Sequence, residues 1–187
     1  FTHNKNNRYI INNLSHELFE DNNLNLVILF NKKHKVVWAE SFNPIKKSTR
    51  PAPKKYVQYF SDHALYMLKN KSKFNSLIAS DLGMGGFVKY PGSQPINFVV
   101  FNSIHYNKSR EIHHGVLVFS RTLTQDYMKS LGKQFNYQIT IHTLSNMKDS
   151  KHGRVILDNL KSMPIFINPI SHNYIMSYRF IKDLDHQ

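Results

Sequence analysis

The 11 histidines are the first side chains to consider for chemistry, because imidazole is the commonest metal ligand in proteins. His113 and His114 are adjacent, so in a strand their rings point to opposite faces and cannot easily chelate one ion. No His-Glu-x-x-His segment occurs, and no two histidines stand four residues apart beside a carboxylate. The absence of cysteine excludes disulfides, thiolate zinc sites and cysteine nucleophiles. We therefore expect no metal site and no cofactor.

The glycines and acidic residues predict no catalytic site. Gly83, Gly85 and Gly86 lack the G-x-G-x-x-G spacing of dinucleotide sites, and no Gly-Lys-Ser or Gly-Lys-Thr follows them. No G-x-S-x-G elbow is present, and the 12 acidic residues are scattered. We expect a domain without catalytic residues, and a hydrolase with an unrecognised site is the least favoured alternative.

Arg121 is the most informative polar residue, because it stands where a predicted strand ends and a predicted helix begins. Its guanidinium could clamp a ligand carboxylate, or it could fix the strand–helix junction, and the structural role is favoured. Trp38 and Tyr90 could line a pocket, although lone aromatic residues more often belong to a core. The candidate ligand-binding residues are Trp38, His63, Tyr90, Asn102, Ser103, Arg121 and Tyr178.

The chain carries a formal net charge of +13, from 25 Lys and Arg against 12 Asp and Glu. Such a charge is compatible with a nucleic-acid or anionic-membrane partner. The basic residues are dispersed, and their clusters are short, as at 32–35, 46–47 and 54–55. A solvated basic surface is therefore favoured, and a basic nucleic-acid-binding module is kept as the alternative function.

The elements that must position these residues follow from hydrophobic periodicity and turn signals. Helices are predicted over 8–20, 54–69, 73–79 and 122–132, the last with Thr122 and Gln125 as a capping box and Gly132 at its end. Strands are predicted over 24–30, 35–42, 95–106, 114–120, 135–144 and 174–181. Residues 43–53 and 147–154 are predicted to be loops, and 155–160 a short helix or strand.

This order of elements predicts an α+β fold, with a central antiparallel sheet of about five strands, an N-terminal helix and helices packed on the sheet. With 41% hydrophobic residues over 187 positions, residues 1–187 are expected to form a single domain. The first residue is Phe1, so we expect a piece of a longer protein. No apolar run approaches the ~20 residues that cross a bilayer.

Several segments resemble the fourth subfamily of CHASE domains, the cyclases/histidine kinases associated sensory extracellular domains. The segment 7–14, which contains Asn7-Arg8-Tyr9-Ile10 and Asn13-Leu14, precedes LNLVILFNKKHKVVW at 24–38, as at the start of that family. Gly86-Phe87, Asn102-Ser103-Ile104 and HGVLVFSRTL at 114–123 are similar to its central part. Tyr178 with 182–184 is similar to its closing strand, although the family's last strand and its upstream tryptophan–aspartate segment are missing.

The resemblance implies a PAS-like fold related to the Cache sensors, located in the periplasm between two membrane helices. It implies an unknown small-molecule or anionic ligand, a homodimer, and an output domain that is a diguanylate cyclase, a cyclic-di-GMP phosphodiesterase or a histidine kinase. Nucleic acid is not an expected partner under this reading. We expect the ligand to bind between the sheet and the helices formed by residues 54–80.

Overall fold

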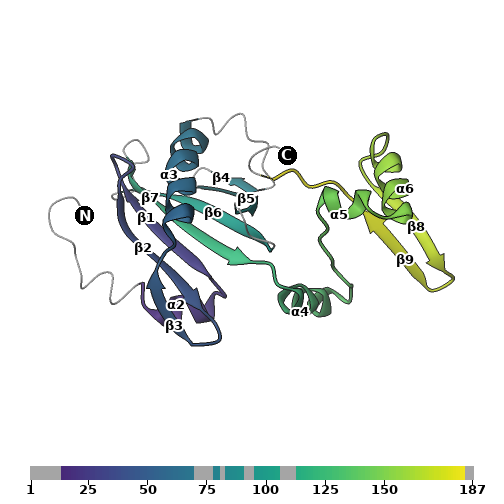
Figure 1. The fold of residues 1–187 in the computed structure, drawn as a ribbon, viewed down its shortest axis with the longest axis horizontal. Helices are drawn as coiled ribbons and strands as arrows, with labels where there is room; N and C mark the ends of the chain where they lie inside the picture. The colour runs from purple at the N-terminus through teal and green to yellow at the C-terminus, as the bar shows by residue number, and fades with distance from the viewer. Residues whose placement is uncertain (1–13, 70–77, 81–82, 91–94, 106–112, 184–187) are drawn as a thin grey trace. The chain divides into compact units, whose positions relative to one another are not determined.

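The computed structural model describes residues 14–69, 78–80, 83–90, 95–105 and 113–183. The chain divides into two compact units (Figure 1), which are described separately. Unit 1 comprises Phe1–Thr124 with Asp183–Gln187, and unit 2 comprises Gln125–Lys182.

Unit 1 is built on one antiparallel sheet of seven strands, in the order β3-β2-β1-β7-β6-β5-β4. Its strands are β1 (Leu26–Asn31), β2 (Val36–Asn43), β3 (Ser48–Pro51), β4 (Ile78–Ser80), β5 (Gly83–Lys89), β6 (Ile96–His105) and β7 (His113–Thr122). The helices described in it are α2 (His16–Asp21) and α3 (Lys54–Lys69). The predicted α+β fold with a central antiparallel sheet is confirmed, with seven strands where about five were expected.

The hairpin formed by β1 and β2 is confirmed close to its predicted bounds. Its turn is stabilised by Asn31, whose side-chain oxygen accepts hydrogen bonds from the backbone N–H groups of Lys33 and Lys35. His34 takes a positive φ of 57°, which closes the turn. Asparagine side chains that bond the backbone two residues on are a common cause of such turns.

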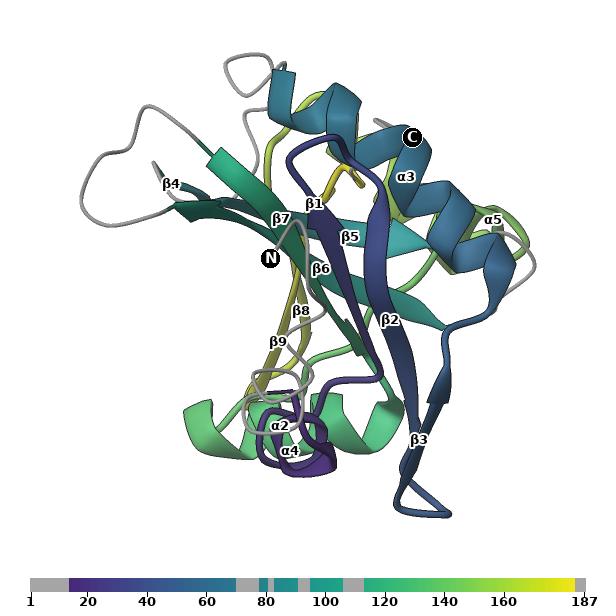
Figure 2. The ribbon, with the colours of Figure 1, turned by 90° about the vertical axis from the view of Figure 1, so that its left-hand side faces the viewer.

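The core of unit 1 lies between the sheet and α3, which crosses one sheet face (Figure 2). Because side chains alternate between the two faces of a strand, one set of positions in the central strands points at α3. Among the side chains of α3 that the structure describes, Phe60 is fully buried. The buried cluster consists of Leu26, Ile28, Phe30, Phe60, Val88, Tyr90, Val99, Phe101, Val116 and Val118.

The opposite face of the sheet meets α2. Phe19 is fully buried there, and its ring stacks on Phe42 at 5.7 Å and lies tilted against Trp38 at 6.4 Å. Of the predicted helix 8–20, only residues from 14 onward are described, and α2 begins at His16. Residues 73–77 of the predicted helix 73–79 also lie outside the described residues. Residues 78 and 79 belong to strand β4, so the helix prediction is wrong for these two residues.

Unit 2 contains α4 (Gln125–Phe135), α5 (Leu144–Lys148), α6 (Lys151–Leu160) and a two-stranded sheet of β8 (Phe166–Ser171) and β9 (Tyr174–Tyr178). The strand predicted over 174–181 is therefore shorter, and β8, its partner, was not expected. The loop predicted over 147–154 is wrong, because α5 and α6 occupy most of it. Ser150 caps α6, since its hydroxyl accepts a hydrogen bond from the Gly153 N–H at 2.9 Å. Residues 155–160 are helical, one of the two predicted alternatives.

The predicted end of α4 and the predicted strand over 135–144 are both wrong. The helix continues past Gly132 to Phe135 and turns at Asn136, whose φ is 57°. The Tyr137 N–H then donates to the Gly132 carbonyl at 2.9 Å, so the chain folds back on its own helix. A Cβ on Gly132 would lie 2.2 Å from the Tyr137 carbonyl oxygen, which explains the glycine inside the helix. The alternating segment after Asn136 pairs with none of the strands that the structure describes.

The predicted capping box is wrong as well. Strand β7 continues through Thr122, and α4 begins only at Gln125. The Thr122 hydroxyl donates instead to the side-chain oxygen of Asn97 at 2.8 Å, across the β6–β7 pair. A threonine at a strand end satisfies the same sequence pattern as a helix cap, and the neighbouring strand decides between the two roles.

Candidate ligand-binding site

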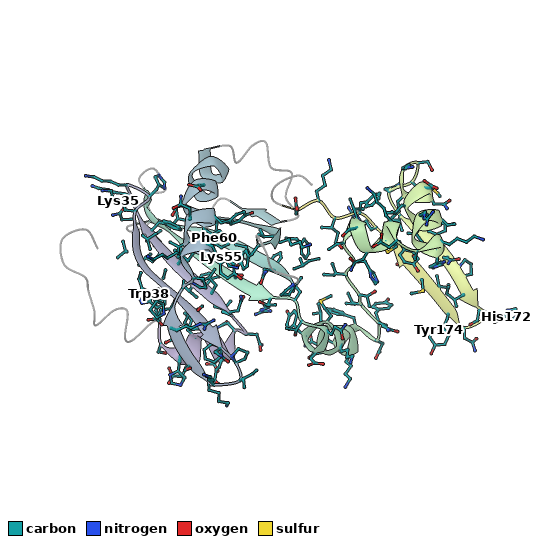
Figure 3. The ribbon with its side chains drawn as sticks, in the orientation of Figure 1. Lys35, Trp38, Lys55, Phe60, His172 and Tyr174 are labelled. Atoms are coloured by element: carbon teal, nitrogen blue, oxygen red, sulfur yellow. The ribbon has the colours of Figure 1, made fainter. Side chains whose placement is uncertain are left out.

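Tyr90 lies where α3 meets the sheet, directly after β5, and is only 2% exposed. Its ring contacts three aromatic residues of α3: the centroid distances are 4.4 Å to Tyr56, 6.3 Å to Tyr59 and 5.6 Å to Phe60. Figure 3 shows Phe60 and Lys55 on this helix, and the Lys55 Nζ lies 5.1 Å from the centre of the Tyr56 ring. The spacing of Tyr56, Tyr59 and Phe60 places them on one side of the helix. The result is an aromatic cluster with one phenol inside it.

The Tyr90 hydroxyl is the start of a buried polar chain. It donates to the Ser120 hydroxyl on β7, which in turn donates to the Asn25 side-chain oxygen at 3.2 Å. Burial raises the pKa of Tyr90 well above its usual value; the Ser120 hydrogen bond lowers it in part and the nearby Tyr56 raises it further. Tyr90 is therefore a neutral hydrogen-bond donor at physiological pH.

A second buried polar residue, Asn97 on β6, lies on the same sheet face. Its side-chain oxygen accepts from Thr122, and its amide nitrogen donates to the Pro95 carbonyl at 3.2 Å. Polar groups in a core are costly unless they are paired, so both Asn97 and Ser120 depend on these partners. We call Tyr56, Tyr59, Tyr90, Asn97 and Ser120 the α3–sheet cluster.

Arg121 makes a structural contact on the other face of the sheet. Its guanidinium Nη2 donates to the carbonyl of Asn22, the C-cap residue that follows α2. A cation bonded to the last carbonyls of a helix is favourable, because these groups have no partner within the helix. This contact agrees with the structural role that the sequence favoured. The carboxylate clamp stays a prediction.

The predicted ligand-binding residues do not form one site. Because strand residues alternate, Trp38, Asn102 and Arg121 lie on the sheet face turned away from α3, whereas Tyr90 lies on the α3 face. Tyr178 belongs to β9 of unit 2, where its ring stacks on Phe166 at 6.1 Å.

Two more of these residues can be placed only by their backbone. Ser103 pairs in register with Val116 in the sheet, and His63 lies within α3, but their side chains are outside the described part. Figure 3 shows Trp38 on the β1–β2 hairpin, the part of the sheet that faces α2. The seven residues are thus distributed over two sheet faces and two units.

Sequence reasoning missed most of the α3–sheet cluster. Ser120 and Asn97 are single polar residues within apolar strand segments, which is a usable signal for a buried polar pair. Tyr56 and Tyr59 recur at helical spacing beside Phe60 on the buried stripe. No local signal connects these residues to Tyr90, because they are brought together only by the packing of α3 on the sheet.

Within the described part, no cluster of three His, Asp or Glu side chains could hold a metal ion. Among the same residues, no helix combines the length and apolar character needed to span a bilayer.

Comparison with known proteins gives one family and one similar structure. The model of the CHASE4 domain matches residues 1–142. The crystal structure of the extracellular domain of a protein described as a histidine kinase, vpHK1S-Z8, is similar over 98% of this chain and 75% of that chain, with a TM-score of 0.52 and 12% sequence identity. At this identity the likeness shows the fold alone. No curated protein matches the sequence.

Proposed function

Since the chain belongs to the CHASE4 family of extracellular sensor domains, we propose that it detects a small ligand at the α3–sheet cluster and passes the signal to an output domain of the same receptor. The output would be a histidine kinase, a diguanylate cyclase or a cyclic-di-GMP phosphodiesterase. We place the domain in the periplasm, as the extracytoplasmic part of an inner-membrane receptor with flanking membrane helices. Residues 1–187 would act as one PAS-like, Cache-like sensor without catalytic activity of its own and would work as a homodimer.

The observation that carries this proposal is the Tyr90–Ser120–Asn25 chain beneath α3. It places the Tyr90 hydroxyl, whose ring packs on the aromatic residues of α3, in contact with two successive polar partners, the buried Ser120 and the half-buried Asn25. Ligand sites have this composition: mostly apolar and aromatic walls with a few polar groups that fix orientation. A ligand that replaces the Tyr90–Ser120 hydrogen bond would separate Tyr90, on which the aromatic rings of α3 pack, from β7.

The signal needs only two arrangements of the sheet and α3 that differ in their affinity for the ligand. Strand β7 is suited to transmit the difference, because its last three residues bond to four other parts of unit 1. Ser120 contacts Tyr90 and Asn25, Arg121 contacts the end of α2, and Thr122 contacts β6. Three residues later the chain enters α4 and unit 2.

A thermal-shift screen of the chain with small carboxylates, amino acids and inorganic anions tests the proposal, since a ligand of the native state raises the unfolding temperature. For a true ligand, we expect Tyr90→Phe to reduce the shift strongly. The matched control is Tyr137→Phe, because Tyr137 is a described tyrosine that is 73% exposed in unit 2. A ligand whose shift is the same in wild type and Tyr90→Phe would contradict the α3–sheet location.

The clamp predicted at Arg121 is tested in the same screen. If Arg121 binds a carboxylate, Arg121→Ala abolishes the response to carboxylates while the response to neutral amines and alcohols remains. If Arg121 only holds the end of α2, the variant lowers the unfolding temperature equally with and without carboxylates. An unchanged carboxylate shift would exclude the clamp. The other predicted contacts, at Trp38, His63, Asn102, Ser103 and Tyr178, stay predictions for this experiment.

A further inference from the structure

The pairing of β6 with β7 changes register at the end of the sheet where three histidines lie. Ile104 pairs with Gly115, and the next residue of β6, His105, pairs with His113. One residue of β7, His114, is therefore left over between the two pairs. An extra residue in one strand of an antiparallel pair is a β-bulge, in which two residues oppose one residue of the partner strand. At this bulge two adjacent histidines of β7 oppose a third histidine on β6.

The bulge removes the reason why the sequence predicted no chelation by His113 and His114. Paired residues share a face, so His113 lies on the face of His105. Gly115 lies on the face of Ile104, which is the opposite face because neighbouring residues of β6 alternate. In a regular strand, positions 113 and 115 would share one face. The alternation is thus interrupted at His114, and it no longer separates the two adjacent histidines.

Three histidines that oppose one another match the ligands that a transition-metal ion prefers. The structure describes them by their backbone alone. Directly paired residues have Cβ atoms about 4.5–5.5 Å apart, which lets two imidazoles reach one ion. Imidazole suits Zn²⁺, Ni²⁺ and Cu²⁺, whereas Mg²⁺ and Ca²⁺ take oxygen ligands. Three histidines also leave a coordination position for water or for an anion.

The turn between β1 and β2 lies at the same end of the sheet (Figure 1). Asn31, at the end of β1, pairs with Gly115 next to the bulge, so the residues that follow Asn31 lie beside the start of β7. Among them is His34, which is half-buried and takes a positive φ of 57°. This turn therefore adds a fourth imidazole to the same end of the sheet.

The same turn also carries three lysines, which repel a cation. Lys32, Lys33 and Lys35 are exposed, so water and salt screen their charges over about 10 Å at 0.1 M ionic strength. Bonds from neutral imidazole nitrogens do not depend on a negative surface, in contrast to the carboxylate sites of hard cations. The basic surroundings thus favour an ion that is held by coordination over one that is held by charge.

We propose that His105, His113 and His114 bind a divalent transition-metal ion of the Zn²⁺ type at the bulge between β6 and β7. The ion would join the end of β6 to the start of β7, the strand whose last residues contact Tyr90 and the end of α2. The proposal does not depend on the α3–sheet cluster, so a screen of organic ligands without hits would leave it standing.

Calorimetric titration of the chain with Zn²⁺ in mildly alkaline buffer tests the proposal. We expect a tight site that Mg²⁺ does not fill, distinct from weak binding by the remaining histidines. His105→Asn, His113→Asn and His114→Asn should each weaken this site at least about tenfold, since even the groups that support a metal ligand contribute that much. The controls are His152→Asn and His172→Asn, exposed positions of unit 2, which should leave the affinity unchanged.

Two results of this titration would overturn the proposal. One is a Zn²⁺ affinity that is the same in wild type and in His105→Asn. The other is a loss of affinity in His105→Asn and His113→Asn with none in His114→Asn, because the bulge would then not supply the third ligand.

A second measurement needs no variant and covers the case in which a replacement unfolds this end of the sheet. Cu²⁺, which imidazole also binds, is paramagnetic and broadens the NMR signals of nearby amides. A small amount of Cu²⁺ should broaden the signals of Ile104 and Gly115 first and spare Leu26 and Ser120, which pair near the other end of β7. Broadening that begins elsewhere and spares Ile104 and Gly115 would assign the metal to other histidines and overturn the proposal.

Discussion

Tyr90 contributes to the packing of unit 1, and in the proposed function it also binds the ligand. Its ring completes the aromatic cluster under α3, while its hydroxyl bonds to Ser120 in a site that water does not reach. Inside such a site a hydrogen bond is stronger than in water, and an unpaired polar group is costly. A ligand that competes for the hydroxyl therefore has to supply a comparable partner.

The raised pKa of Tyr90 predicts a pH dependence of stability. Its stabilising contribution is fully present below the unfolded pKa of about 10 and is lost as the pH rises from there toward the folded pKa. Tyr90→Phe should cost about 1–2 kcal/mol near pH 7. It should also flatten the fall in the free energy of unfolding at alkaline pH. Urea unfolding at neutral and alkaline pH, with Tyr137→Phe as control, measures both effects, and an alkaline slope that is unchanged would contradict the assignment.

At the scale of elements, Gly115 marks a close approach between the backbones of β1 and β7. Gly115 pairs with Asn31, and a Cβ placed on it would lie 2.2 Å from the Phe30 carbonyl oxygen. Only glycine fits so near a neighbouring backbone, and a backbone atom in a paired strand cannot move aside cheaply. The glycine in HGVLVFS is thus explained by the strand beside it.

Gly115→Ala should destabilise the chain by more than about 2 kcal/mol, because the new methyl group overlaps backbone in the middle of the sheet. Gly85→Ala in β5 is the matched control, since its Cβ would lie 3.1 Å from the Val99 carbonyl oxygen and needs only a small adjustment. Its cost should stay below about 1 kcal/mol. Urea denaturation of both variants gives the comparison, and equal midpoints would show that β1 and β7 can separate locally.

At the scale of the whole molecule, the two units differ in how their apolar residues are used. In unit 1 the large side chains of β1, β6 and β7 are buried under α3, whereas in unit 2 many remain exposed on β8 and β9. Secondary structure in unit 2 therefore depends more on local features, such as the Ser150 cap of α6 and the chain reversal after α4.

The net charge of +13 is also a property of the whole molecule. If the basic residues form a solvated surface, binding to duplex DNA should be weak at low salt and should disappear near physiological ionic strength. Fluorescence anisotropy with labelled duplexes of two unrelated sequences measures this. Tight binding that survives physiological salt would favour the nucleic-acid-binding alternative over a solvated basic surface.

The sequence by itself determined the elements whose signals are local: the hairpin with its Asn31 turn, helix α3 and the β6–β7 pair. It also determined the membership of the CHASE4 family. Only the tertiary structure decided what those elements pair with. The alternating segment after Asn136 has the pattern of a strand but pairs with no strand in the described part of the chain. Thr122 has the pattern of a helix cap but bonds across a sheet to Asn97.

For the candidate site too, the sequence indicated single residues, and the tertiary structure decided which of them lie together. Arg121 was recognised as a junction residue from its position, yet the sheet face it occupies, opposite to Tyr90, depends on the register of β7 between β1 and β6. A shift of one residue would exchange the two faces. That register is set by long-range pairing and by the packing of α3, which no single stretch of sequence contains.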